Sequence, residues 1–477
     1  MTPRNERAAA RGTVRTRRRG SRLLVPALLA GLAAGLLAGP APAAAAAGSA
    51  APDAPGGWIV VLKEPGRTGA AAAAPADTAR DLLGRLSGSR LGHVYASALR
   101  GFSARMGRAQ AQRLAADPRV AYVEPDTPVH LGERAGSAGT AGPAGTAGTA
   151  ATPGTAGTGV PAGTAATPGT AGTAGTAGAA GPAGTAGTAG PAGTAATQPG
   201  APWGLDRIDQ RRLPLSTTYT YRTTAPGVRV YVIDTGLRTT HTEFGGRASV
   251  GVDTVGDGRG GQDCNGHGTH VGAIAAGTTY GVAKQARPVA VRVLDCTGSG
   301  TTSAVIAGVD WVTAHAVKPA VATMSIGGAA STALDAAVRS SIASGVTYTV
   351  AAGSAAQSGG ACATSPSRVA EAVTVGATDR TDRKASSSNY GACVSLFAPG
   401  VGIPSAWHTG DAATATLSGT SPATAHAAGA AALHLAFRPA DTPAQVKQAL
   451  VANATTGVLQ GDPPPTPNKL LYTLYLP

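Results

Sequence analysis

Three separated segments of the chain carry an acid, a base and a nucleophile in glycine-rich surroundings. Asp234 ends the run V-Y-V-I, His267 stands in N-G-H-G-T-H, and Ser421 stands in S-G-T-S-P-A. The order acid, base, nucleophile is one of the few chain orders in which a Ser-His-Asp triad assembles. These residue types predict acyl transfer through a serine, with peptide-bond hydrolysis as the first hypothesis.

Each of these residues also has a simpler interpretation when it is taken alone. An Asp before Thr-Gly could be a turn or half of an aspartic-protease site, but the chain has no second D-T-G or D-S-G. His267 and His270 could bind a metal, yet no H-E-x-x-H carboxylate accompanies them. Ser421 could merely cap a helix. The three segments in this order favour chemistry over all three alternatives.

The elements that must position these residues can be predicted from the same segments. Residues 228–234 predict a strand that delivers Asp234 at its carboxyl end, where sites in parallel sheets form. The Ala- and Gly-rich stretch from His267 to Gly277 predicts a buried helix. A second helix should follow Ser421, whose backbone N–H and helix dipole would stabilise charge on an attacked carbonyl.

The rest of the C-terminal part alternates between strand-like and helical patterns. This alternation predicts an α/β fold with a parallel sheet covered by helices on both faces. The further predicted strands are 290–294, 320–325, 347–351 and 372–376, and the predicted helices are 303–315, 332–344 and one that starts at Thr442-Pro443.

Residues 57–131 predict a small α+β domain. Its expected strands are 58–62, 101–106 and 120–125, the last an edge strand stopped by proline, and its expected helices are 78–86 and 109–116.

The first 47 residues predict a secretory signal peptide. Arginines precede an apolar stretch at 23–38, and small A-x-A sequences follow it. The apolar stretch is shorter than the ~20 residues that a membrane span needs. We therefore expect a secreted, extracellular protein without a membrane anchor after processing, exported by the general route rather than the twin-arginine route that Arg18-Arg19 would mark.

Residues 132–200 consist of Gly-Thr-Ala and Gly-Pro-Ala repeats and predict a flexible linker. Glycine recurs at every third position between residues 169 and 193, which is the collagen period and raises the alternative of a trimeric stalk. Sparse proline and breaks in the period favour the linker. The globular domain then covers 201–460, and 461–477 form a C-terminal tail.

Charge and cysteine distribution exclude other functions. The net charge is +14, but the first 50 residues alone hold eight Lys or Arg against one Asp or Glu. No basic stripe with interleaved aromatics remains, so nucleic-acid binding is not expected. In an oxidising compartment the four cysteines predict two disulfides, for which three connectivities are possible. A zinc site is not expected because the chain has no C-x-x-C pair, and free thiols are the less favoured alternative. These cysteines are Cys264, Cys296, Cys362 and Cys393.

Residues 203–458 contain several longer motifs besides the three segments above. They are W-G-L-D-R-I-D-Q at 203–210, H-T-E-F-G-G-R-A at 241–248, V-A-V-R-V-L-D-C-T-G-S-G at 289–300, M-S-I-G-G at 324–328 and S-N-Y-G at 388–391. With these motifs the segment resembles the subtilisin-like serine proteases, in particular the secreted proteinase K and aqualysin branch. Residues 57–131, with L-R-G-F-S-A-R-M and Y-V-E-P-D, are similar to the inhibitory prodomain of that family.

The resemblance implies roles for individual residues. Asp234, His267 and Ser421 would form the triad, the disulfides would pair sequentially, and no cofactor would be needed for the chemistry. A monomer would act on proteins or peptides, with its own prodomain as inhibitor. Substrate would bind as an added strand along Gly298, Ser299, Gly300, Ser325, Ile326 and Gly327.

The chain departs from its family at the oxyanion hole. The family has an Asn in A-A-G-N, but this chain reads A-A-G-S with Ser354, which leaves the backbone N–H of Ser421 as the unchanged donor. Pro422 also replaces the family's Met. We expect a slow protease, and the alternative is an impaired relative that binds peptides or serves as a surface scaffold.

Structural calcium is a second point of departure. Asp206, Asp209 and Gln210 match a calcium site of some relatives, but Ser216 replaces a further Asp ligand. After Cys393, Val394 and Ser395 stand where relatives have another Asp ligand. Bound calcium and ordinary surface carboxylates both fit this sequence.

The maturation cut has two candidate positions. In the family that the chain resembles, the cut falls just before the catalytic domain, which here would be near residues 198–201. Because the linker is long, a cut near Leu131 is equally compatible with the sequence.

Overall fold

The computed structural model describes residues 56–64, 73–132, 195–461 and 464–476. The predicted signal peptide, and the linker with its collagen-like alternative between residues 133 and 194, lie outside the described residues. Within the described ranges, no helix is long and apolar enough to cross a bilayer.

The N-terminal domain is a four-stranded antiparallel sheet with two helices, in the strand order β2-β3-β1-β4. Its core joins Val60 and Phe102 of the sheet to Leu82 and Leu114 of the helices. The predicted edge strand is confirmed. β2 is an addition to the predicted strands, because its sequence R-L-G-H-V-Y contains a glycine and half of its residues are exposed, so it gives little strand signal. The elements are β1 (Gly56–Leu62), α1 (Pro75–Gly84), β2 (Arg90–Tyr95), β3 (Gly101–Met106), α2 (Arg108–Ala115) and β4 (Val120–Pro125).

The C-terminal domain is built on a nine-stranded sheet in the order β20-β21-β17-β16-β14-β12-β8-β10-β9. All its pairings are parallel except that of β20 with β21, so the predicted parallel sheet is confirmed. The strands are β8 (Arg229–Asp234), β9 (Ser249–Asp253), β10 (Arg287–Arg292), β12 (Ala320–Met324), β14 (Thr347–Ala351), β16 (Val373–Thr378), β17 (Leu396–Pro399), β20 (Thr455–Thr456) and β21 (Lys469–Leu470).

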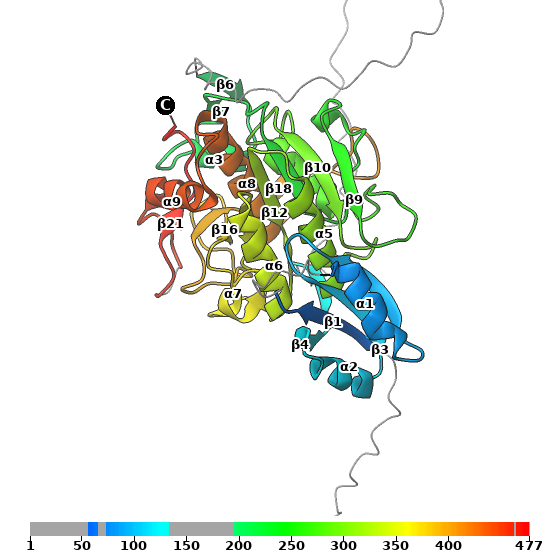
Figure 1. Ribbon diagram of the computed structural model, residues 1–477. Coiled ribbons are helices and arrows are strands. Elements are labelled where there is room, and N and C mark those ends of the chain that lie inside the picture. Colours follow the sequence, from blue (N-terminus) through cyan, green and yellow to red (C-terminus); the bar gives the residue numbers. More distant parts are fainter. Residues whose placement is uncertain (1–55, 65–72, 133–194, 462–463, 477) are drawn as a thin grey trace, which may run out of the picture. The chain divides into compact units, whose positions relative to one another are not determined.

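Helices cover both faces of this sheet, as Figure 1 shows for α5 and α6 on one face and α8 on the other. Along β8, Val230 and Val232 belong to the cluster of α4 and α8, whereas Tyr231 and Ile233 belong to that of α5 and α6. This alternation is the period of two that a strand requires. The helices are α3 (Trp203–Ile208), α4 (His267–Ala276), α5 (Thr302–His315), α6 (Thr332–Ala343), α7 (Gly360–Ala363), α8 (Thr420–Phe437), α9 (Pro443–Asn453) and the short η1 (Thr242–Phe244).

The abundance of alanine has a structural consequence, since α8 is buried along almost its whole length. A Cβ added at Gly429 would lie 2.5 Å from the Cβ of Val282 and 2.9 Å from the carbonyl oxygen of Ala275 in α4. Only small side chains allow helices and loops to approach this closely.

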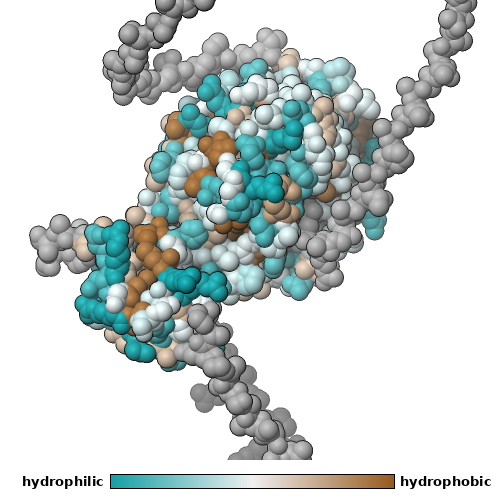
Figure 2. Space-filling view, turned by 90° about the vertical axis from the view of Figure 1, so that its right-hand side faces the viewer, coloured by the Kyte–Doolittle hydropathy of each residue, from teal (hydrophilic) through white to brown (hydrophobic). Residues whose placement is uncertain are grey.

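One face of the protein is mixed in hydropathy. Figure 2 shows hydrophobic residues gathered in separate areas of an otherwise hydrophilic or neutral face.

Three smaller sheets complete the fold of the described residues. The four-stranded one, in the order β11-β5-β13-β15, contains β5 from the N-terminal domain. Another joins β6, from the end of the predicted linker, to β7. Their strands, with those of the β18 and β19 hairpin, are β5 (Pro128–Leu131), β6 (Ala196–Pro199), β7 (Thr218–Tyr221), β11 (Ser299–Thr301), β13 (Ile326–Ala329), β15 (Thr364–Ser365), β18 (Ile403–Ala406) and β19 (Thr414–Leu417).

Two disulfides join the cysteines in sequential order, Cys264 to Cys296 and Cys362 to Cys393. The pairing that the family resemblance implied is confirmed.

Candidate active site

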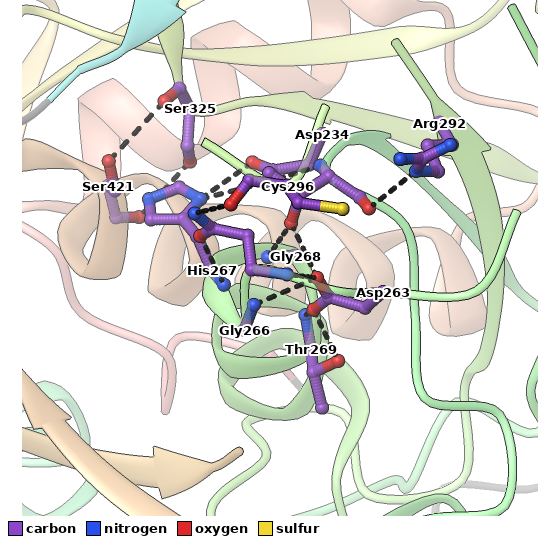
Figure 3. A network of polar contacts seen from close by, with 12 residues as sticks. Asp234, Asp263, Gly266, His267, Gly268, Thr269, Arg292, Cys296, Ser325 and Ser421 are labelled. Carbon is purple, nitrogen blue, oxygen red and sulfur yellow. Dashed lines mark hydrogen bonds and ion pairs between the residues drawn. The ribbon is translucent and has the colours of Figure 1, made fainter. Parts of the chain in front are cut away.

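Asp234 and His267 form a buried pair at the ends of two elements. Asp234 is the last residue of β8, and His267 is the first residue of α4. The His267 Nδ1 lies 2.8 Å from Oδ1 and 3.0 Å from Oδ2 of Asp234, and both side chains are at most 2% exposed. Figure 3 shows the pair beside Ser421 and Ser325. Because the carboxylate only accepts, Nδ1 must carry the proton, and Nε2 is left as the basic nitrogen of the neutral ring.

Asp263 holds the turn that presents His267, and sequence analysis did not identify it. Its Oδ1 accepts hydrogen bonds from the Thr235 hydroxyl at 2.9 Å and from the Gly266 N–H at 2.8 Å. Its Oδ2 accepts from the N–H and the hydroxyl of Thr269 at 2.9 and 2.6 Å. Asp263 thus ties the start of α4 to the residue after Asp234. An Asp just before a glycine-rich turn was the signal available.

The glycines around His267 are required by close contacts. Gly266 has a φ of +112°, and a Cβ there would lie 2.5 Å from the ring of Trp407. A Cβ on Gly268 would lie 2.1 Å from the carbonyl oxygen of Gly236. A side chain at Gly268 would press on the loop that follows β8, and one at Gly266 would press on Trp407. Either would shift the start of α4, and with it the His267 ring.

Ser421 is the second residue of α8 and does not cap it. The N-cap position is taken by Gly419, which contributes no side-chain hydrogen bond. The Ser421 hydroxyl lies 3.4 Å from the backbone carbonyl oxygen of Ser325. The Ser325 hydroxyl likewise lies 3.4 Å from the backbone carbonyl oxygen of Ser421. Pro422 stands in the first turn, where a missing N–H costs no intrahelical bond, and α8 continues to Phe437.

Ser354 lies beside the residue that precedes Ser421. Its Oγ accepts a hydrogen bond from the Thr420 N–H at 3.1 Å and lies 3.2 Å from the Thr420 hydroxyl. The Thr420 hydroxyl in turn accepts from the Gly353 N–H at 3.2 Å. The Ser354 side chain is therefore engaged with the first turn of α8.

Asn389, from the S-N-Y-G motif, holds the loop that carries Ser354. Its Oδ1 accepts from the Ala355 and Gln357 N–H groups at 3.2 and 3.0 Å, and its Nδ2 donates to Ala352 at 2.8 Å. Since these three bonds use its amide, Asn389 supports the loop.

The six predicted substrate-binding residues lie along β5, the end of the N-terminal domain, and the residue that follows it, Gly132. In the antiparallel register, His130 is opposite both Ser299 and Gly327, Val129 is opposite Gly300, and Leu131 is opposite Ile326. The Leu131 N–H donates to Gly298 at 3.2 Å, and the Gly132 N–H donates to Ser325 at 2.9 Å. A segment of the chain itself therefore lies as a strand between β11 and β13 and ends near Ser421, and we call this place the groove.

Two carboxylates of the N-terminal domain bind the N-terminal ends of two helices of the C-terminal domain. Glu124 accepts from the Thr332 N–H at 3.2 Å, at the start of α6, and also from the Ser331 hydroxyl. Asp126 accepts from the N–H and hydroxyl of Ser303 at 2.8 and 2.6 Å, at the start of α5. These contacts satisfy N–H groups that have no partner within their own helix.

The residues considered for calcium do not fit a calcium shell. The Asp206 carboxylate accepts from the N–H and hydroxyl of Ser216 at 3.0 and 2.9 Å and from the Thr217 N–H at 2.7 Å. The Gln210 side-chain amide donates to two carbonyl oxygens. The Asp209 carboxylate accepts from the Thr220 N–H at 2.5 Å. Across the described part of the chain, no group of three or more His, Cys, Asp or Glu residues could hold a metal ion.

Comparisons with known proteins agree with this geometry. The profile described as "Subtilase family" matches residues 225–468, and "Peptidase inhibitor I9" matches residues 58–132. The chain is 46% identical over 388 residues to an extracellular serine proteinase of Thermus sp. (strain Rt41A), covering 81% of this chain and 79% of that protein. It is 52% identical over 277 residues to alkaline serine exoprotease A of Vibrio alginolyticus, covering 58% of this chain and 51% of that one. A solved cold-adapted subtilisin-like serine proteinase matches with 52% identity and a TM-score of 0.56, covering 58% of this chain and 99% of that chain.

Proposed function

The chain belongs to the subtilase family and is a subtilisin-like serine endopeptidase with an I9 inhibitor domain, and from this premise we propose how it works. We propose that it is secreted as a precursor, cuts itself, and hydrolyses peptide bonds through an acyl-enzyme on Ser421. The observation that carries the proposal is the buried Asp234–His267 pair beside Ser421, at the end of a groove that holds an extended segment. The name of the Thermus relative supports secretion. The domain boundaries remain predictions.

The Asp234–His267 pair is suited to general base catalysis. With the proton held on Nδ1 by Asp234, Nε2 can take the proton of Ser421 as its oxygen attacks the carbonyl carbon. The imidazolium that forms lies against a carboxylate that is 1% exposed, so little water screens the attraction. His267 then gives the proton to the leaving amine, and water releases the acyl group.

Stabilisation of the oxyanion should be the weak part of this site. The Ser421 N–H at the start of α8 is one donor. Ser354 and Thr420 have one hydroxyl proton each, and a hydrogen bond between the two hydroxyls uses one of them. At most one hydroxyl proton then remains to bind an oxyanion. The direction in which this proton can point is limited, because the Ser354 and Thr420 hydroxyls also accept bonds from backbone N–H groups. We propose that turnover is slow for this reason.

The groove should accept peptides as an added antiparallel strand between β11 and β13. Backbone contacts do not depend on sequence, whereas side-chain pockets do. Val129 is 1% exposed and belongs to the core cluster of α5 and α6, so we expect a preference for an apolar residue at this place in substrates. Substrates are proteins or peptides with otherwise broad sequence.

The inhibitor domain should block the enzyme through the same groove. β5 occupies the substrate strand, while Glu124 and Asp126 bind the starts of α6 and α5. Release of this domain is then required for activity on other proteins.

A second candidate function is peptide binding with little or no peptide hydrolysis. The only observation in its favour is Ser354 at the position of the family's Asn. A fluorophosphonate probe separates the two functions, because it reacts with an activated serine and needs no turnover. We expect labelling of the processed protein and none of Ser421→Ala. Absence of label on folded protein freed of its inhibitor domain would favour the peptide binder.

A further inference from the structure

We propose that the precursor cuts the bond that follows Gly132, so that the segment from residue 133 to 200 stays on the enzyme rather than on the released inhibitor domain. This inference rests on the proposed function and specifies its first substrate. It chooses between the two positions that the sequence leaves open.

Gly132 is placed at the nucleophile by two contacts. Its N–H donates to the carbonyl oxygen of Ser325 at 2.9 Å, and the Ser421 hydroxyl lies 3.4 Å from that same oxygen. A Cβ built on Gly132 would lie 3.5 Å from the Ser421 Oγ. The Gly132 carbonyl carbon is bonded to the same Cα and is the carbonyl that Ser421 would attack.

The register of β5 is fixed by burial on one side of the strand. Val129 is 1% exposed, whereas His130 is exposed. A shift by one residue would turn Val129 out of the core and bring His130 in, because side chains alternate along a strand. The pairs His130 with Ser299 and Leu131 with Ile326 therefore cannot slip easily, and Gly132 stays at the catalytic end.

The alternative position, residues 198–201, lies in an ordered element of the catalytic domain. β6 pairs with β7 at four positions from Ala196 to Pro199. Gln198 Nε2 donates to Thr279 at 3.2 Å, and the Ala201 N–H donates to Thr217 at 3.1 Å. This segment would have to leave its sheet before it could enter the groove as a strand. The I9 match also ends at residue 132.

The step uses only groups of this chain and water. The Ser421 oxygen bonds to the Gly132 carbonyl carbon, and its proton passes to His267. The carbon–nitrogen bond after Gly132 breaks, and the proton moves from His267 to the departing amine. Water then adds to the Gly132–Ser421 ester, one of its protons returns through His267 to the Ser421 oxygen, and Gly132 is left with a free carboxyl group.

The test follows the first cleavage of the full chain in purified protein. The new N-terminus and the intact masses are determined by mass spectrometry at early times and at several protein concentrations, with Ser421→Ala beside the wild type. We expect a first new N-terminus at residue 133, a rate independent of concentration, and no cut in Ser421→Ala. A first N-terminus between residues 198 and 202, or no cut, would overturn the inference.

Two substitutions test the placement directly. Gly132→Pro removes the N–H that binds Ser325 and should slow the cut on the order of tenfold or more. Gln198→Ala, which removes the contact to Thr279, is the matched control and should leave the rate unchanged. A slower cut in Gln198→Ala with a normal rate in Gly132→Pro would contradict the proposal. Gly132→Ala keeps the N–H and should be cut at the same bond, which covers the case that the proline variant misfolds.

Labelling with a fluorophosphonate separates failure of this inference from failure of the proposed function. Wild type that is labelled at Ser421 but cut elsewhere refutes the Gly132 site and leaves the protease function standing. Protein that is neither cut nor labelled refutes both.

Discussion

The Oγ of Ser354 accepts a hydrogen bond from the Thr420 N–H, with 3.1 Å between the two atoms, one residue before Ser421. That N–H is among the first of α8 and has no partner within the helix. Ser354 therefore contributes an acceptor to the helix that carries the nucleophile. In our proposal, no equivalent group replaces the donor that the family's Asn would offer to an oxyanion.

We predict that Ser354→Asn raises kcat. The Asn Oδ1 can accept from Thr420 as the serine does, while Nδ2 offers an N–H that a hydroxyl lacks. Removing such a side-chain donor from a subtilisin costs about 10²- to 10³-fold in turnover, so an increase of up to about that size is expected. The measurement is kcat on a peptide substrate, with active enzyme counted by titration. Ser354→Ala is the control and should not gain activity, and an unchanged rate in Ser354→Asn would refute our account of the slow step.

We predict that Asp234→Asn lowers kcat by about 10⁴-fold without loss of the fold. An amide in this place can donate to Nδ1 and so stabilise the tautomer whose Nε2 cannot accept a proton. Circular dichroism and thermal unfolding should match those of Ser421→Ala. A loss of less than about tenfold would remove Asp234 from the triad.

We predict that Asp310→Ala weakens inhibition by the N-terminal domain. The Asp310 carboxylate on α5 accepts from the N–H groups of Ala96, Ser97 and Ala98 at 3.1, 2.7 and 2.7 Å. Loss of hydrogen bonds to a charged group should raise the inhibition constant on the order of 10- to 100-fold. Glu371→Gln, whose exposed carboxylate pairs with Arg339, is the matched control. Equal inhibition of both variants would show that the groove alone holds the inhibitor.

We predict a pH-dependent gain in stability from Asp209→Asn. Burial raises the pKa of Asp209 from its ordinary value of 3.8 to about 6. Between these values the unfolded state has lost the proton and the folded state keeps it, so wild-type stability falls as pH rises and levels off above about pH 6. Asn does not ionise and can still accept from the Thr220 N–H.

The advantage of Asp209→Asn should thus be small below about pH 4 and reach on the order of 1–3 kcal/mol above about pH 6. Urea unfolding in a Ser421→Ala background, which prevents self-digestion, measures it. An advantage that does not change with pH would show that Asp209 does not titrate in this way.

We predict that the two disulfides differ in their effect on activity. Their sequence separations are 32 and 31 residues, so removing either should cost a similar ~3–4 kcal/mol. The Cys264–Cys296 disulfide lies at the active-site turn, where Asn265 donates to the Cys296 carbonyl oxygen at 3.1 Å. At a temperature where both variants are folded, replacing these two cysteines by serine should lower kcat/KM, and replacing Cys362 and Cys393 should not. Equal activities would contradict this.

The elements found from sequence are those whose pattern is local. The strand that ends at Asp234 alternates between two apolar faces, and the helix at Thr442-Pro443 starts with a capping Thr and a first-turn proline, so each could be recognised from a few neighbouring residues. β5 and β6 have no such pattern. β5 pairs with strands about 170 and 200 residues later in the chain, and β6 follows glycine-rich repeats.

The sequence by itself determined the family, the parallel sheet, the acid, base and nucleophile and the unusual Ser354, because each depends on residue type and short-range order. Only the tertiary structure decided that Asp263 holds the His267 turn, that Ser354 binds Thr420, and that Gly132 lies at Ser421. The last two are contacts between segments far apart in the chain, with no local signal in the sequence. Asp263 has a local signal, but its bond to Thr235 lies 28 residues back in the chain. These contacts exist only once the sheet brings its carboxyl ends together and buries Val129 beside them.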